Sequence, residues 1–337
     1  MGDTIKALVV GGGSIGARHL SNLSRLGINY SALVEPDPQR RESVCDDSIL
    51  GFADLKTGLE WGPDLVVIAT PSHLHAEQAL EAARRGIHLF IEKPLSHLED
   101  GLAELSREID RQRLITLVGC NMRFHPGPAR VKKLLDQGVV GRVLFARVHT
   151  GSYLPDWRPW QDYRKSYSAS SSMGGGCILD CIHEIDLARW YLGDVESVFC
   201  SAGHLSSLEM DVEDVATLIC KHSRGATSEI HLDYVQRTYE RGCQIVGEKG
   251  TIFWDYSQGE VRWFDALEDS WTRFMGPKSW DPNQMYLDEM EHFLECVRHG
   301  RRTIFPVSDA VRVMNIVFAA KASARSGCIE RVEGVQS

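Results

Sequence analysis

The sequence predicts an α/β protein of two domains: a doubly wound parallel sheet first, then an α+β domain with a large open, mainly antiparallel sheet. Up to about residue 120, short apolar runs alternate with amphipathic helical segments, which is typical of βαβ units. Beyond about residue 140, strand patterns follow one another without helices between them, which indicates antiparallel pairing. A chain of 337 residues is long enough for two such domains.

The first predicted strand, Ile5–Val10, runs directly into glycines, and a helix is predicted over Ile15–Leu26. The glycines fit the pattern Gly-x-Gly-x-x-Gly. In this pattern the first glycine permits a tight turn, the second lets the backbone approach a pyrophosphate, and the third packs the helix against the strand. Phosphates then bind the N–H groups at the helix N-terminus. We therefore expect a Rossmann-type dinucleotide site at Gly11, Gly13, Ser14, Ile15 and Gly16. A plain structural turn is the alternative.

The second predicted strand ends at an acid, Glu35, nineteen residues after Gly16. A carboxylate at this place binds both hydroxyls of the adenosine ribose and repels a 2′-phosphate. The sequence therefore predicts NAD as the cofactor. Arg40 and Arg41 follow closely and could turn toward a phosphate, so NADP stays open as the alternative.

The remaining strands of the first domain are predicted at 49–52, 63–70, 87–91 and 114–120, with helices at 75–85 and 99–113. Open α/β sheets bind ligands at the carboxyl ends of their strands. Polar or ionisable residues follow three of these strands. For Lys93, the alternative to a place in the cleft is a surface lysine before a turn. The residues that we expect to line the cofactor cleft are Thr70, Pro71, His75, Glu92, Lys93 and Asn121.

The second domain begins near residue 123, with a helix predicted at 126–137. Strands are predicted at 142–149, 195–202, 215–222, 226–235, 243–246, 251–254 and 261–264, with a hairpin turn at 247–250. Residues 143–148 and 215–220 do not alternate between apolar and polar, so we expect parts of the sheet to be covered on both faces. A second subunit is the natural candidate for one face and a packed loop is the alternative. We expect a homodimer or homotetramer.

Two amphipathic helices are predicted near the end of the chain, at 284–298 and 308–325. The second carries too many apolar residues for one exposed surface, and we expect it to pack between the domains. We assign residues 1–122 to dinucleotide binding and residues 123–337 to substrate binding and oligomerisation.

The composition limits the classes of partner. A net charge of −9 argues against nucleic acid. The sequence contains no run of 18 apolar residues, so we expect no membrane span. The first predicted strand starts so early that we expect no signal peptide. Nine scattered cysteines without CxxC pairs favour reduced thiols in the cytoplasm.

The stretch 173–186 reads as a helix entered through glycines. At helical spacing, Asp180 and His183 lie one turn apart, opposite a row of isoleucines. A histidine there is a candidate proton carrier, and a buried histidine bonded to Asp186 is the alternative. A metal site built from Cys177, Asp180, Cys181 and His183 is conceivable. The two cysteines face away from His183, so we expect no metal.

These motifs together resemble the glucose–fructose oxidoreductase / inositol dehydrogenase (Gfo/Idh/MocA) family. The resemblance covers nearly the whole chain through GGGSIGARH, ATPSHLHAEQALEAARRGIHLFIEKPLS, NMRFHP, GGGCILDCIHEIDLARW and PVSDAVRVMNIVFAAKASARSG. It implies a sugar or polyol substrate, NAD(P), and a sheet used for oligomerisation. By position, Lys93 matches the family's catalytic lysine, His183 its helix histidine and Asp180 the accompanying acid. The Lys93–Pro94 bond is expected to be cis.

One departure from the family pattern concerns Asp180. Many members separate this acid from the histidine by three residues, and here only Cys181 and Ile182 intervene. This spacing is similar to a branch associated with surface-polysaccharide sugars. It makes the catalytic role of Asp180 less secure than that of His183.

The segment 156–167 combines aromatic residues with arginine and lysine. Aromatic faces suit sugar rings, and cationic groups suit a carboxylate or phosphate. An ordinary loop anchored by its aromatic residues is the alternative. The residues that we expect to contact substrate are Arg123, Trp160, Tyr163 and Arg164.

The sequence therefore predicts an NAD(P)-dependent oxidoreductase. The expected reaction transfers a hydride between the nicotinamide and a secondary hydroxyl or ketone of a sugar, polyol or nucleotide-sugar derivative. Two alternatives stay open: glycoside cleavage through transient oxidation with retained NAD, and a non-catalytic protein that senses NAD(P).

Overall fold

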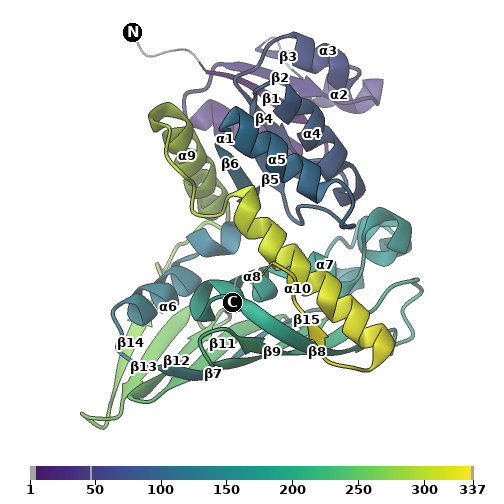
Figure 1. Cartoon of the computed structure of the whole chain (residues 1–337). Coiled ribbons are helices and arrows are strands. Elements are labelled where there is room, and N and C mark those ends of the chain that lie inside the picture. The colour runs from purple at the N-terminus through teal and green to yellow at the C-terminus, as the bar shows by residue number, and fades with distance from the viewer. Residues whose placement is uncertain (1–4, 46–47, 335–337) are drawn as a thin grey trace. The chain divides into compact units, whose positions relative to one another are not determined.

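The computed structural model describes residues 5–45 and 48–334 (Figure 1). Contacts between residues divide the chain into two compact units. The first unit contains residues 1–121 and 282–311, and the second contains residues 122–281 and 312–337. Residues 282–311, which we assigned from the sequence to the second domain, thus group with the first unit. The expectation about a signal peptide concerns residues before Ile5, which lie outside the described ranges.

The first unit is built on a six-stranded parallel sheet in the order β3-β2-β1-β4-β5-β6. Its strands are β1 (Lys6–Val10), β2 (Tyr30–Val34), β3 (Ile49–Phe52), β4 (Leu65–Ile68), β5 (His88–Glu92) and β6 (Thr116–Gly119). The central strands are buried along nearly their whole length, as their unbroken apolar runs predict. The strand order reverses between β1 and β4, which is where doubly wound sheets bind ligands. The predicted fold of this unit is confirmed.

The helices of this unit are α1 (Ser14–Arg25), α2 (Pro38–Val44), α3 (Leu55–Glu60), α4 (His75–Arg84), α5 (Leu102–Gln112) and α9 (Asn283–His299). The pattern search did not predict α2 and α3, which are short. Each begins after an aspartate whose carboxylate accepts backbone N–H groups: Asp37 from Gln39 and Arg40, and Asp54 from Thr57. Asp37 is also followed by a proline at the first helical position, which is a readable start signal.

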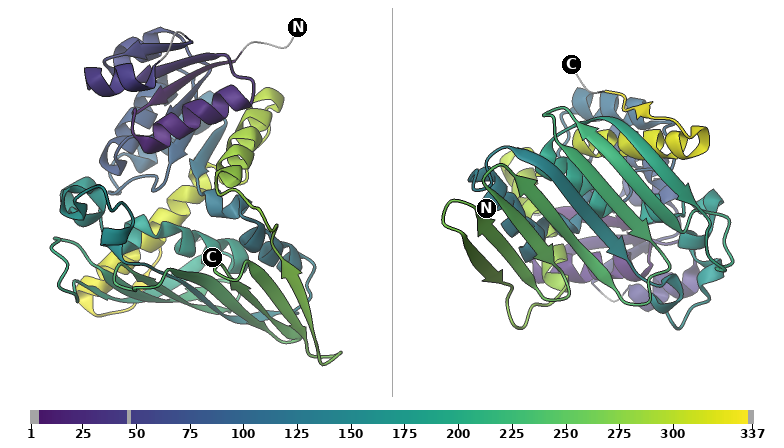
Figure 2. Two further views of the ribbon diagram at one scale, coloured as in Figure 1. Left: turned by 180° about the vertical axis from the view of Figure 1, so that it is seen from behind. Right: turned by 90° about the horizontal axis from the view of Figure 1, so that it is seen from below.

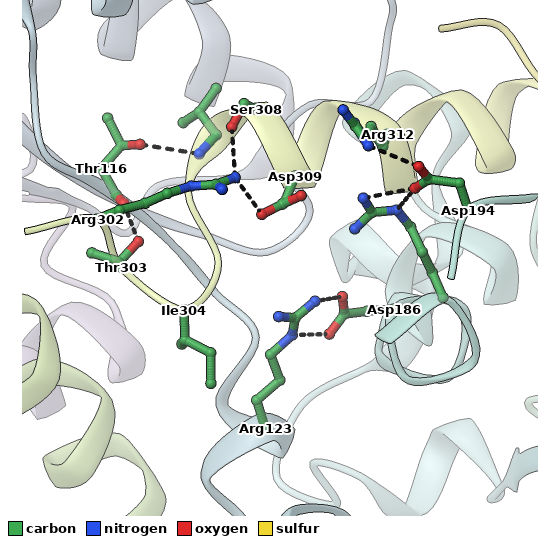
Figure 3. A network of polar contacts seen from close by, with 12 residues as sticks. Thr116, Arg123, Asp186, Asp194, Arg302, Thr303, Ile304, Ser308, Asp309 and Arg312 are labelled. Carbon is green, nitrogen blue, oxygen red and sulfur yellow. Dashed lines mark hydrogen bonds and ion pairs between the residues drawn. The ribbon is translucent and has the colours of Figure 1, made fainter. Parts of the chain in front are cut away.

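The segment that joins α9 to α10 (Val307–Ser326) explains why residues 282–311 belong to the first unit. The Val118 N–H donates to the carbonyl of Phe305 (2.9 Å), and the Val307 N–H donates to the Thr116 hydroxyl (3.0 Å). The Thr303 hydroxyl donates to the Thr116 carbonyl at 2.5 Å (Figure 3). This segment therefore lies along β6, the edge strand of the parallel sheet.

The second unit is built on a nine-stranded sheet in the order β14-β13-β12-β11-β7-β10-β9-β8-β15. Its pairs are antiparallel except that of β7 with β10. The strands are β7 (Val143–Gly151), β8 (Val195–Gly203), β9 (Val215–His222), β10 (Thr227–Asp233), β11 (Glu240–Gly247), β12 (Gly250–Asp255), β13 (Glu260–Asp265), β14 (Ser270–Met275) and β15 (Glu330–Arg331). The mainly antiparallel sheet and the hairpin at 247–250 are confirmed, and β14 and β15 were missed.

Helices cover one face of this sheet, and the right-hand view of Figure 2 shows the other face without a helix in front of it. On the covered face, α6 (Pro126–Asp136) packs against β12 and β13, and α8 (Ile182–Leu192) against β7 and β10. From residue 312 onward, α10 (Val307–Ser326) belongs to this unit. Burial alternates along β9: Leu218 is buried, whereas Ile219 is 42% exposed on the open face.

The predicted helix over 173–186 is two helices, so that prediction was wrong. α7 (Cys177–Asp180) ends at Cys181, whose backbone angles (φ −91°, ψ 34°) leave the helical region, and α8 begins at Ile182. Hydrogen bonds to the Asp180 side chain from outside the helix, described below, hold this end in place.

Short 3-10 turns occur at Ser72–Leu74, Asn121–Phe124, Leu154–Asp156, Tyr163–Lys165, Tyr167–Ala169 and Ser171–Met173. Across the described ranges, the helices are all too short or too polar to span a membrane.

Candidate functional site

The glycine turn of the first unit has the geometry of a phosphate cradle. Gly11 has φ +103°, and a Cβ there would lie 2.7 Å from the Ala69 carbonyl oxygen. A Cβ at Gly16 would lie 1.9 Å from the Gly11 carbonyl oxygen, so both positions require glycine. Gly13 faces open space and precedes α1, whose N-terminus has no side-chain cap. The first-turn N–H groups, including those of Ser14 and Ile15, are thus available to a pyrophosphate.

Glu35 lies buried at the carboxyl end of β2, beside the glycine turn. Its Oε2 accepts the Gly12 N–H (2.8 Å), and its Oε1 accepts the Asp37 N–H (3.0 Å). The Arg40 guanidinium lies 3.6 Å from Oε2, and Arg41 donates to the Glu35 carbonyl at 2.6 Å. The carboxylate is therefore held in place at the end of β2, beside the glycine turn, and both arginines turn toward Glu35.

His75 joins the loops that follow β4 and β5. Its Nδ1 lies 2.8 Å from the Pro94 carbonyl oxygen and its Nε2 lies 2.8 Å from the Thr70 carbonyl oxygen. Burial lowers the pKa of His75, although these two carbonyls and Glu92 oppose the shift. Both ring nitrogens face backbone carbonyls, and the neutral ring donates to one of them, so His75 helps to hold the loops at Thr70 and Pro94 in place. The Lys93–Pro94 bond is cis, as predicted.

Glu92 ends β5, and Lys93 follows it, half-buried. The Glu92 Oε1 lies 2.6 Å from Nε2 of His19, a residue of α1 that we did not single out from the sequence. In the sequence, the one feature that marks His19 is its place three residues after the last glycine of the turn. Asn121 is buried just after β6, at the third strand end.

In the second unit, two arginines pair with the two acids that follow His183 along α8; Arg123 is buried and Arg241 is half-buried. Arg123 donates from Nε (2.8 Å) and Nη2 (2.6 Å) to the two carboxylate oxygens of Asp186 (Figure 3). The Arg241 Nε lies 2.8 Å from Oε1 of Glu184. Asp186 is thus committed to Arg123 and does not bond His183. The Arg123 guanidinium, which we expected to contact substrate, lies in this buried pair and over the Trp190 ring at 5.0 Å.

Asp180 is buried, and three hydroxyl groups donate to its carboxylate. Tyr167 donates to Oδ1 (2.9 Å), while Ser168 (2.6 Å) and Tyr234 (3.2 Å) donate to Oδ2. Burial and the neighbouring charge of Asp180 raise the pKa of Tyr234 well above its usual range, so its hydroxyl stays a donor. Donors of this kind stabilise the ionised carboxylate. Ser168 and Tyr234 were not identified from the sequence, because neither stands in a motif.

Near the start of α8, His183 is buried in its first turn, three residues after Asp180. The other expected substrate residues lie farther out. Trp160 is 82% exposed, and the Tyr163 hydroxyl accepts the Glu209 N–H at 3.0 Å. Arg164 pairs with Asp162 (2.9 Å) and Glu209 (3.2 Å). The structure therefore buries both Asp180 and His183 but leaves Trp160 in solvent.

The cysteines at 177 and 181 are buried thiols. Burial raises the pKa of Cys177 well above its usual range, with Glu213 adding to the rise, so this group stays protonated. Within residues 5–45 and 48–334, no three His, Cys, Asp or Glu side chains are arranged to hold a metal ion.

Two protein-family models match the chain, one over each predicted domain. Residues 5–120 match the family model described as an oxidoreductase family with an NAD-binding Rossmann fold. Residues 129–253 match the model of the GFO/IDH/MocA C-terminal domain. Together the two models cover most of the chain.

Relatives with similar sequence or structure are dehydrogenases. The scyllo-inositol 2-dehydrogenase (NAD(+)) of Bacillus subtilis strain 168 is 29% identical, covering 97% of this chain and 96% of the relative. Levoglucosan dehydrogenase, solved with NADH, has a TM-score of 0.89 at 20% identity, covering 98% of this chain and 100% of the other. The WlbA dehydrogenase of Bordetella pertussis, solved with NADH and UDP-GlcNAcA, has a TM-score of 0.82 at 23% identity, covering 97% and 98%.

The glycine cradle, the buried carboxylate at the end of β2 and the six-stranded order fit the NAD-binding domain that the family model describes. The chain belongs to the GFO/IDH/MocA family and is an oxidoreductase with an NAD-binding Rossmann domain at residues 5–120.

Proposed function

We propose that this oxidoreductase acts on a secondary hydroxyl group of a sugar, a polyol or a sugar derivative. The observation that carries the proposal is the environment of His183. This histidine lies in the first turn of α8, where Arg123 and Arg241 neutralise both neighbouring acids. A buried histidine in this position is suited to exchange a proton with substrate. The relatives named for inositol, levoglucosan and UDP-GlcNAcA support the substrate class.

His183 takes the hydroxyl proton when the alcohol is oxidised and returns it when the ketone is reduced. Lys93, half-buried after β5, stabilises the negative charge that develops on the substrate oxygen. Asp180, fixed by three hydroxyl groups, lies at the end of α7, three residues before His183. When bound, the nicotinamide accepts or returns the hydride.

The first unit holds the cofactor in this proposal. The N–H groups at Gly13, Ser14, Ile15 and Gly16 bind the pyrophosphate, and Glu35 binds the adenosine ribose. Thr70, Pro71, Glu92 and Asn121 line the nicotinamide end, at the carboxyl edge of the sheet.

Arg158 supports an anionic substrate, such as a uronate or a nucleotide sugar. It is half-buried, and its guanidinium lies 5.8 Å from the centre of the Tyr167 ring, whose hydroxyl donates to Asp180. Within the described ranges Arg158 forms no ion pair, whereas Arg164 pairs with Asp162 and Glu209. An uncommitted positive charge beside the candidate catalytic acid attracts a carboxylate or phosphate group on the substrate. Trp160 and Tyr163 then contact the sugar rings.

A homo-oligomer built on the open face of the nine-stranded sheet is part of the proposal. Phe199 and Ile219 are opposite each other on β8 and β9, and they are 39% and 42% exposed on that face. Paired apolar side chains on an uncovered sheet face are typical of a protein interface. A second copy of the chain is the expected partner, and nucleic acid and membranes are not.

A cytoplasmic location completes the proposal. All nine cysteines are free thiols, and eight of them are at least partly buried. Their odd number and scattered spacing suit a reducing compartment.

The test is a panel of polyols, neutral sugars, uronates and nucleotide sugars, assayed with NAD for the absorbance of the reduced nicotinamide. We expect turnover with at least one member and loss of turnover in His183→Asn. If bonds in glycosides break while no external NAD is consumed, the reaction is glycoside cleavage with retained cofactor. Binding of NAD without any turnover across the panel would favour a sensing protein.

A further inference from the structure

His19 and Glu92 form a buried pair behind the loop that carries Lys93. His19 is 0% exposed, and its Nε2 lies 2.6 Å from Oε1 of Glu92, which is short for a hydrogen bond between nitrogen and oxygen. The rings of Phe90 and Tyr286 lie edge-on to the imidazole, at 4.9 and 6.4 Å between centres. These two rings help to shield the imidazole from solvent. Its hydrogen-bonding partner is Glu92.

The tautomer of His19 follows from its second nitrogen. Nδ1 is buried and meets no hydrogen-bond partner within the part of the chain that the structure describes. A proton on Nδ1 would be an unsatisfied buried donor, so the neutral ring carries its proton on Nε2 and donates it to Glu92. Glu92 is then the acceptor of this hydrogen bond.

The second oxygen of Glu92 contacts the backbone of Lys93. The Lys93 N–H donates to Oε2 at 3.3 Å, and a Cβ at Gly119 would lie 3.1 Å from the same oxygen. Glu92 is therefore confined on one side by β6 and bonded at both oxygens, once to His19 and once to the residue that bears the amine. The carboxylate connects α1 to the start of the Lys93 loop.

Other charged groups of the first unit face this pair. Arg18 lies over the Tyr286 ring at 4.5 Å, from the same helix as His19. Burial raises the pKa of Tyr286, the charges of Glu92 and Glu289 add to the rise, and Arg18 and Lys93 oppose it. Burial lowers the pKa of His75; the charge of Glu92 opposes this shift and the charge of His73 adds to it.

We propose that His19 is a positioning residue for the reaction: its Nε2–H group holds the Glu92 carboxylate in place, and the carboxylate in turn holds the backbone at the start of the loop that carries Lys93. This inference rests on the catalytic role proposed for Lys93. Without the donor, the buried carboxylate loses its hydrogen bond to α1, and the Lys93 N–H loses a fixed acceptor. Lys93 is then aimed less accurately at the substrate oxygen, which lowers the rate.

Two substitutions at one position separate positioning from packing. His19→Gln keeps an N–H donor at a reach similar to Nε2, and His19→Leu keeps the volume but removes the donor. In the full-length enzyme we expect His19→Leu to lower turnover by about 10- to 100-fold. We expect kcat to fall while the KM of the substrate changes little, because the loss is in the placement of Lys93 for the transition state. His19→Gln should restore kcat. NAD affinity should change little in either variant.

A buried histidine of the second unit supplies the matched control. His222 is also fully buried, and its ring nitrogens lie near Ser228 Oγ (2.8 Å) and the Gly193 carbonyl oxygen (2.9 Å). His222→Leu should lower the melting temperature without lowering the kcat of the folded enzyme. A folded His19→Leu enzyme with the wild-type kcat would overturn the inference.

Nitrogen NMR of the His19 ring in the wild-type enzyme tests the geometry without reference to turnover. We expect a protonated Nε2 and a bare Nδ1 near neutral pH, and a protonated Nδ1 would overturn the inference. Lys93→Ala tests the proposed function separately: if it leaves turnover intact, the role of Lys93 fails, whatever the NMR result for His19.

Discussion

Arg123 and Asp186 lie 63 residues apart in sequence and form a buried two-point ion pair, with N–O distances of 2.8 and 2.6 Å (Figure 3). The pair occupies both oxygens of the acid that sequence spacing had offered as a partner for His183. Asp186 is therefore held by Arg123 rather than by His183. The first prediction therefore concerns His183.

His183→Asn should abolish proton exchange while it keeps a polar side chain of similar reach. Loss of a general acid–base group costs about 10²–10⁴ in rate, or roughly 3–5 kcal/mol of activation free energy. We expect turnover to fall by this factor while NAD affinity and melting temperature stay near wild type. Kinetics, NAD titration and thermal unfolding of one variant check this, and near-normal turnover in the folded variant would rule out the catalytic role.

Glu35→Ala should weaken NAD binding and narrow the preference over NADP. Hydrogen bonds to a charged group contribute about 1.5–3 kcal/mol, so we expect the Kd of NAD to rise by roughly 10-fold or more. The Kd of NADP should fall or stay constant, because the repelling carboxylate is gone. Isothermal titration of wild type, Glu35→Ala and the exposed control Glu60→Ala measures this. A wild-type protein that prefers NADP would contradict the assignment.

Arg158→Leu should discriminate against anionic substrates. If the guanidinium binds a substrate carboxylate or phosphate, KM for an anionic member of the panel should rise by about 10-fold or more, while KM for a neutral sugar stays constant. Arg164→Leu is the control, because Arg164 is exposed and already paired with Asp162 and Glu209. Equal effects of the two substitutions on both substrate types would contradict a role for Arg158 in charge recognition.

His125 should make the protein less stable in mild acid. Its Nδ1 accepts the Gly127 N–H (3.0 Å) at the start of α6, which requires an unprotonated nitrogen. Burial, followed by the positive charge of Arg241, lowers the pKa of His125 from 6.5 to about 4. Between these values the unfolded chain binds more protons than the folded one, so stability falls as pH falls from 6.5 to 4.

The loss from His125 is about 3 kcal/mol at most. His125→Asn keeps a side-chain acceptor for the Gly127 N–H and cannot titrate, so its unfolding free energy should depend less on pH over that window. Urea unfolding at a series of pH values checks this, with the exposed His299→Asn as the control. Parallel pH curves for wild type and His125→Asn would show that His125 does not contribute.

Ile219→Arg should disrupt the oligomer. Ile219 faces Phe199 across β8 and β9 on the open face of the sheet, and a buried arginine there would lack a partner. In sedimentation at micromolar concentration we expect wild type to be a dimer or tetramer and Ile219→Arg to be smaller. Leu267→Arg, in the exposed turn between β13 and β14, should leave the assembly unchanged. A wild-type monomer would contradict the interface.

Much of the fold could be predicted because its signals are local. The glycines at 11–16 occur where backbone atoms approach too closely for a side chain, and Glu35 stands at a fixed distance from them along the chain. The short helices α2 and α3 were missed because their apolar periodicity is too brief, although Asp37 and Pro38 marked the start of one. The break at Cys181 was missed because helical spacing alone says nothing about hydrogen bonds from elsewhere in the chain.

The sequence by itself determined most of the longer elements and the motif residues, because hydrophobic periodicity, turn chemistry and glycine spacing act between neighbours along the chain. Only the tertiary structure decided the partners of the buried charges: Arg123 with Asp186, Arg241 with Glu184, His19 with Glu92, and three hydroxyl groups with Asp180. These partners lie 12 to 73 residues apart. A buried charge is stable only beside a complementary group, and which group it meets depends on how helices and strands pack.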